Sequence, residues 1–222
     1  MPNTEEQRLD IIENCNILLN GILKPFEQTD DTPEGRMITQ LKWLRERAEN
    51  HDLALPVDKG MLASLRYIYT NGDIAHLASS EDKVHGEVEI YMGRLIDLCK
   101  NAKLLFKSPY IPATLNMIDD LINLLKQANR PLSEHEQGMI PELQQLKTLL
   151  AEGKIEPPLQ SYFPDYPHFR KVYRLNKSSI DDLPNGKYLC KTVANLIFEG
   201  IRPDTWSSPE EAERETRALL QN

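Results

Sequence analysis

The chain has 222 residues, with 26 Lys and Arg against 34 Asp and Glu, which gives a formal net charge of −8 at pH 7. A chain of this length buries about 70% of its unfolded surface, so it can build a core without disulfides or metals. The acidic excess disfavours binding to the phosphate backbone of DNA, and no apolar run approaches the roughly 18 residues of a membrane span. The composition therefore predicts a soluble protein that binds neither DNA nor membranes.

The cellular setting is predicted from the N-terminus and the cysteines. Residues 1–6 lack the basic and apolar regions of a secretory signal. Cys15, Cys99 and Cys190 are odd in number and lie in apolar surroundings, which is typical of reduced core thiols. We therefore expect a cytoplasmic protein.

The fold class follows from the aliphatic residues. The sequence contains 31 Leu but only 5 Val. Because Leu favours helices and β-branched residues favour strands, this imbalance predicts an all-α protein.

The first helix is predicted from Thr4 to about Leu23, with a buried stripe at Leu9, Ile12, Asn16, Leu19 and Leu23. Thr32-Pro33-Glu34 then opens a second helix that runs to Ala48, because Thr is a good N-cap and Pro suits the first turn. A shorter helix over 57–69 ends at Asn71-Gly72, and Ser80 caps a long amphipathic helix over 84–102.

Two further helices complete the predicted bundle. One covers 111–125, with Pro112 in its first turn, and the other begins at a capping box of Ser133 and Glu136 and ends at Gly153. Since the connections are short, we expect a compact bundle of about six antiparallel helices over residues 1–153.

The amino-acid composition changes over residues 154–177. Four prolines there disfavour a regular helix, and five of the fifteen aromatic residues lie between Tyr162 and Tyr173. We interpret this segment as an irregular crossover anchored on the bundle by rings such as Phe163 and Phe169, although rings beside basic groups also suit a single-stranded nucleic acid. Two shorter helices, at about 188–199 and 209–220, follow in residues 178–222 and are expected to pack on the bundle, giving one domain overall.

Acidic residues cluster in two stretches of the predicted bundle. Residues 1–34 hold eight acidic and two basic residues, and residues 73–97 hold six and two. Such clusters attract and orient a basic protein. The predicted partner-binding residues are Asp73, Glu81, Asp82, His85 and Glu89.

A metal site is the alternative explanation of the residues around His85. Glu81, His85 and Glu89 are one turn apart and share a helix face, and carboxylate and imidazole groups are metal ligands. A surface stripe of ion pairs explains the same pattern more simply, so we predict no metal.

Catalytic patterns are weak. Arg45 and His51 show a spacing found in some helical ribonucleases, but at the end of a helix a cationic side chain is favoured by the helix dipole alone. The sequence contains no glycine-rich phosphate loop, nucleophile elbow or H-E-x-x-H motif, and we predict no cofactor.

The leading prediction is a non-catalytic protein-binding protein. Its small size and acidic charge favour an inhibitor that neutralises a cationic protein, in the manner of an immunity protein or an antitoxin. A helical enzyme, metal-dependent or ribonuclease-like, is the first alternative. A helical scaffold or adaptor is the second.

Overall fold

A computed structural model describes residues 4–26, 31–58, 60–62, 83–100, 103–159, 166–174, 179–203 and 205–219. Most of these residues are helical, and the two strands, β1 (Leu104–Leu105) and β2 (Ile201–Arg202), have two residues each. The all-α prediction is therefore confirmed. None of the helices in these ranges combines the length and apolar composition that a membrane span requires.

The chain divides into two compact units, unit 1 with residues 1–105 and unit 2 with residues 106–222. Each encloses its own core of buried hydrophobic residues. The boundary lies inside the 1–153 bundle that the sequence predicts, and residues 106–153 share a core with the C-terminal helices. Helical periodicity indicates which side chains favour burial, but it does not show which helices bury them against one another.

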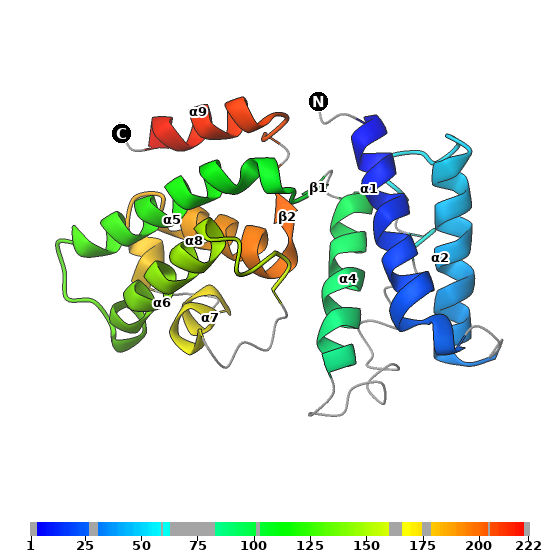
Figure 1. Cartoon of the computed structure of the whole chain (residues 1–222), viewed down its shortest axis with the longest axis horizontal. Helices are drawn as coiled ribbons and strands as arrows, with labels where there is room; N and C mark the ends of the chain where they lie inside the picture. The colour runs from blue at the N-terminus through cyan, green and yellow to red at the C-terminus, as the bar shows by residue number, and fades with distance from the viewer. Residues whose placement is uncertain are drawn as a thin grey trace. The chain divides into compact units, whose positions relative to one another are not determined.

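In unit 1, α1 (Thr4–Ile17) contacts both α2 (Pro33–Glu49) and α4 (Lys83–Lys100), and the three lie side by side (Figure 1). The predicted start of α2 is confirmed, because Thr32 Oγ1 accepts a hydrogen bond of 3.1 Å from Gly35 N and Pro33 is the first residue. The predicted helix over 57–69 lies largely outside the described residues.

The buried face of α1 differs from the predicted one. Gln7, Asp10 and Asn14 are buried, whereas Leu9 is 55% exposed. The Asn14 amide donates to Tyr91 O on α4 at 2.8 Å, and Asp10 Oδ2 accepts from Leu105 N at 2.8 Å. Because Asp10 and Asn14 each make a hydrogen bond to a backbone group, they can take positions on the inner face, and Leu9 lies outside.

The end of α1 also changes its winding. After Ile17 the chain continues as a π-helical turn, η1 (Leu18–Ile22), and a 3₁₀ turn, η2 (Lys24–Phe26). The π-helical turn keeps the chain helical close to the predicted end at Leu23. Such turns are rare and are often found at functional sites.

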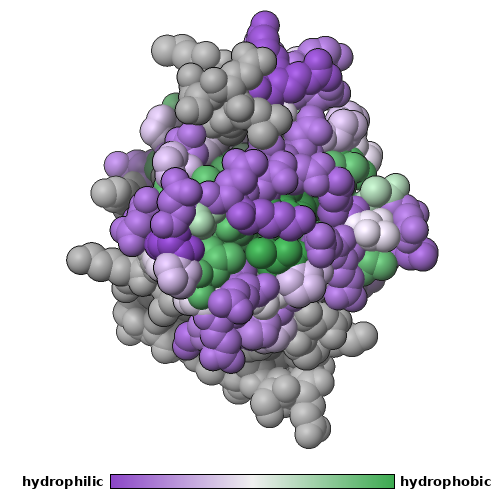
Figure 2. Space-filling model, turned by 90° about the vertical axis from the view of Figure 1, so that its left-hand side faces the viewer, coloured by the Kyte–Doolittle hydropathy of each residue, from purple (hydrophilic) through white to green (hydrophobic). Residues whose placement is uncertain are grey.

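Unit 2 is built around α5 (Ile111–Lys126), which follows the 3₁₀ turn η4 (Ser108–Tyr110). It contacts α6 (Glu134–Ala151), α8 (Gly186–Ala194) and α9 (Pro209–Leu219). The turns η5 (Ser179–Asp182) and η6 (Asn195–Glu199) flank α8. Figure 2 shows one face of this unit, where hydrophobic residues gather in the middle and hydrophilic residues surround them.

The start of α6 is fixed by the predicted capping box of Ser133 and Glu136. Arg130 adds two hydrogen bonds to the Glu136 carboxylate, at 2.7 and 3.0 Å, and a third to Ser179 O. Burial by itself would raise the pKa of Glu136, but the hydrogen bonds from Arg130 and Ser133 lower it to about 2. Arg130 thus ties the α5–α6 connection both to α6 and to η5.

The expectation of no regular helix in 154–177 is wrong for its second half, where α7 (Pro167–Arg174) packs on α6. Pro167 is the first residue of α7, a position where the missing N–H costs no helical hydrogen bond. Phe169 is buried, and its ring lies 5.3 Å from that of Phe198, as expected of an anchor. Phe163 lies outside the described residues.

The cysteines agree with the prediction of core thiols. Cys15, Cys99 and Cys190 are all buried and free. Burial raises the pKa of Cys15 and of Cys190 to about 12, so both are thiols at neutral pH.

Candidate functional site

Of the predicted partner-binding residues, Asp73, Glu81 and Asp82 lie outside the described residues. His85 and Glu89 belong to α4, but the structure does not describe their side chains. This group therefore stays a prediction. Two other candidate sites lie in unit 1.

The first candidate is the outer face of α1. Glu5, Leu9 and Glu13 are exposed and follow one another at intervals of four residues, so they form one line along the helix. Leu9 has the largest exposed fraction among the large hydrophobic residues in the described ranges. The line therefore presents an apolar side chain between two carboxylates, and we call it the α1 face.

The N-terminal end of the α1 face is held by local ion pairs. The Arg8 guanidinium donates a hydrogen bond to the Glu5 carboxylate. The His51 ring, just beyond α2, lies with Nδ1 3.5 Å from Glu5 Oε2. These pairs are exposed, so they orient Glu5 with little gain in stability.

Arg45 and His51 do not form the ribonuclease-like pair that their spacing suggested. Arg45 Nη1 donates to Asn16 Oδ1 at 3.0 Å, whereas His51 contacts Glu5. Asn16 and Glu5 are eleven residues apart on the same helix, which corresponds to about 16 Å along its axis. The two side chains therefore do not converge on one phosphate group.

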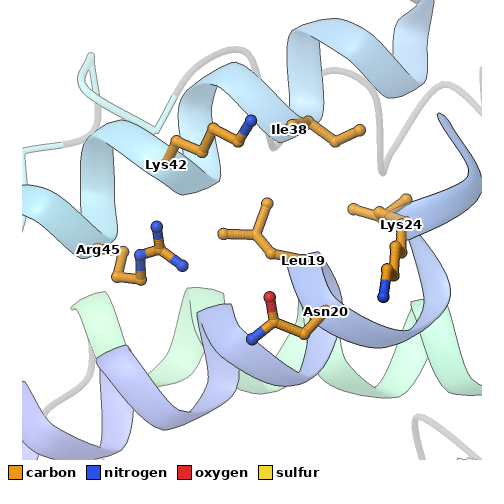
Figure 3. Close-up of a pocket in the computed structure, with 7 residues that line it drawn as sticks. Leu19, Asn20, Lys24, Ile38, Lys42 and Arg45 are labelled. Carbon is orange, nitrogen blue, oxygen red and sulfur yellow. The ribbon is translucent and has the colours of Figure 1, made fainter. Parts of the chain in front are cut away.

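The second candidate is a pocket of about 130 Å³ between α2 and the end of the first helix (Figure 3). Leu19, Leu23 and Ile38 give it an apolar floor, and polar side chains surround that floor. The polar group comprises Asn20, Lys24, Lys42 and Arg45.

The charge of this pocket is opposite to that of the whole chain. Three of its seven lining residues are cationic, on a chain of net charge −8. The Arg45 Nε atom is buried without a hydrogen bond, and Glu49 Oε1 is 3.6 Å from it. Cations around an apolar floor suit an anion that carries a short apolar group.

The sequence places Glu5 and Glu13 in the acidic stretch 1–34, but it does not show that Leu9 is exposed between them, because the periodic pattern assigns Leu9 to the buried stripe. The pocket has no sequence signal, because Lys24 is separated along the chain from Lys42 and Arg45 and only folding brings them together.

Comparisons with protein-family models, with curated proteins and with solved structures gave no match.

Proposed function

We propose that this chain is a non-catalytic protein-binding protein that inhibits a basic protein partner, and that unit 1 supplies the binding surface. The observation that carries the proposal is the α1 face, on which an exposed Leu9 lies between Glu5 and Glu13. Lys and Arg side chains match such a face, because their aliphatic stems cover an apolar group while their cationic heads meet carboxylates.

The charge distribution supports the same proposal. Residues 1–105 hold 18 acidic and 12 basic residues, whereas residues 106–222 hold 16 and 14. Most of the net negative charge therefore belongs to unit 1, where it attracts a basic partner over long range. Asp73, Glu81, Asp82, His85 and Glu89 belong to the same part of the chain and remain the residues predicted to bind the partner.

The test begins with capture of the partner from the native cell and its purification. Leu9→Arg removes the apolar contact and adds a positive charge between Glu5 and Glu13, so it should slow association with a basic partner at least about tenfold. Met61→Arg is the matched control, because Met61 is a second exposed hydrophobic residue of unit 1, 46% exposed, and lies outside α1. Wild-type association should also slow steeply as salt is raised.

Two results would contradict the proposal in different ways. If the purified partner binds the Leu9→Arg variant as fast as the wild type, the α1 face is not the binding surface. If the partner keeps its full activity in the complex, binding stands but the inhibitor assignment fails, and a scaffold becomes the better description.

The pocket favours a second candidate function, the binding of a small organic anion. Its three cations and apolar floor suit a short-chain carboxylate or a phosphate ester. Such ligands should raise the melting temperature of the wild type and should not raise that of a Lys24→Ala, Lys42→Ala variant. Lys126→Ala, on an exposed residue of unit 2, is the control that should respond like the wild type.

A further inference from the structure

Two histidines of unit 2 approach each other although 33 residues separate them in the sequence. His135 lies near the start of α6 and His168 near the start of α7. Their Nδ1 atoms are 3.2 Å apart, and their ring centroids are 5.5 Å apart with the planes tilted by 48°. Both side chains are partly exposed, so solvent can reach them.

The position of His168 is fixed from two sides. The buried carboxylate of Glu142 accepts hydrogen bonds from His168 N at 3.0 Å and from Phe169 N at 2.7 Å. The His168 ring lies against Gly138, where an added Cβ would be only 2.4 to 2.6 Å from ring atoms. A glycine is therefore required here for the ring to reach His135.

The backbone at His135 is fixed as well, because His135 lies in the first turn of α6 between the two members of the capping box. That turn is further tied down by the hydrogen bonds between Arg130 and Glu136. The two imidazoles therefore project from well-anchored helix starts, which keep their rings close together.

We propose that His135 and His168 form a binding site for a divalent transition metal of the zinc class, coordinated by the two Nδ1 atoms. Imidazole nitrogens bind such metals at about 2.0–2.1 Å. With the two Nδ1 atoms 3.2 Å apart and the ring centroids 5.5 Å apart, the nitrogen lone pairs point almost directly at each other. Both rings must therefore turn, by roughly 40° each, before their lone pairs meet at a metal. Bonds of this length then enclose an angle of about 100–105° at the metal, close to the tetrahedral value.

The protonation state must change when the metal binds. Without metal, one Nδ1 carries a proton and donates it to the other, because two lone pairs at this distance repel each other. With metal, both Nδ1 atoms present lone pairs and the protons reside on the Nε2 atoms. Acid weakens binding, since protonated imidazoles cannot coordinate.

The site supplies two protein ligands. No group of three or more His, Cys, Asp or Glu residues able to hold a metal is found in the described ranges, and Glu142 is already engaged by two backbone amides. At least two positions of a tetrahedral metal are then filled by water or by a group from another molecule. This inference departs from the prediction of no metal, and it does not depend on the proposed partner.

The test uses Zn²⁺ itself as the probe, in calorimetric titrations of the full chain near neutral pH. The wild type should bind one Zn²⁺ per chain and release protons, which is read from titrations in two buffers of different ionisation enthalpy. His135→Ala and His168→Ala should each weaken binding at least about tenfold. His51→Ala is the matched control, because His51 is an exposed histidine of unit 1 and should not matter.

Gly138→Ala tests the geometry of the site most directly, since it keeps both histidines and displaces the His168 ring. It should weaken Zn²⁺ binding as much as the loss of a ligand does. His135→Gln, which preserves size and polarity, covers the case in which an alanine variant fails to fold. Nitrogen NMR shifts of the two imidazoles in the wild type should move together at one equivalent of Zn²⁺.

The proposal is overturned if the wild type binds no Zn²⁺ at millimolar concentration. It is also overturned if His51→Ala weakens binding as much as His135→Ala, since that would show scattered surface binding. Unchanged binding in both His135→Gln and His168→Ala would equally place the metal elsewhere.

Discussion

Asp120 on α5 is a buried carboxylate that should make stability depend on pH. It is 5% exposed, and neither carboxylate oxygen has a hydrogen-bond partner within the described part of the chain. Burial, with a smaller effect of the neighbouring Asp119 charge, raises the pKa of Asp120 from 3.8 to about 6. The folded protein therefore binds this proton more tightly than the unfolded chain does.

The sign and size of the effect follow from proton linkage. Because the pKa is higher in the folded state, the free energy of unfolding decreases as the pH rises from about 4 to above 6. At about 1.36 kcal/mol per pH unit, the difference between 3.8 and about 6 corresponds to at most about 3 kcal/mol. Asp120→Asn removes this dependence, since an amide does not ionise.

The assay is urea unfolding of the wild type and Asp120→Asn at several values between about pH 4 and pH 8. The other carboxylates contribute equally to both proteins, so their effect cancels in the difference. The free energy of unfolding of the variant should therefore increase by up to about 3 kcal/mol relative to that of the wild type across this pH range. Asp119→Asn is the control, because Asp119 is half-exposed and paired with Lys147 at 2.7 Å, and its effect should stay below about 1 kcal/mol. If the Asp120→Asn variant and the wild type differ by the same amount at both ends of the range, the carboxylate is not destabilised by burial and the reasoning is refuted.

Three further predictions concern stability. Glu136→Gln should lower the free energy of unfolding by about 3 kcal/mol above pH 4.5, because folding lowers the pKa of Glu136 from 4.5 to about 2. The difference between the two proteins should disappear as the pH falls towards 2, and unfolding curves measured in acid would show this. Phe169→Ala should lower the free energy of unfolding by about 3–5 kcal/mol in urea, and a smaller loss would mean that the cavity beside Phe198 collapses or fills. Thr32→Ala removes the N-cap of α2 and should cost about 1 kcal/mol, and wild-type melting behaviour would show that the cap contributes nothing.

The sequence by itself predicted most of the local structure in the described ranges. The N-cap at Thr32, the capping box of Ser133 and Glu136, and the starts of the long helices all follow from residues within one turn of each other. These signals are local, so no knowledge of the fold is needed to interpret them. Pro167 is one of the four prolines that the sequence analysis takes to disfavour a helix, yet it is the first residue of α7, where proline is tolerated.

The tertiary structure decided everything that depends on contacts between distant segments. The inner face of α1 carries Asp10 and Asn14, which hydrogen-bond to backbone groups of β1 and α4, and Leu9 lies outside. The meeting of His135 with His168 likewise requires α7 to pack on α6 at Gly138. The spacing of hydrophobic residues indicates which face of a helix favours burial. Which side chains are buried depends on the groups that they contact, and these contacts form only when the helices pack.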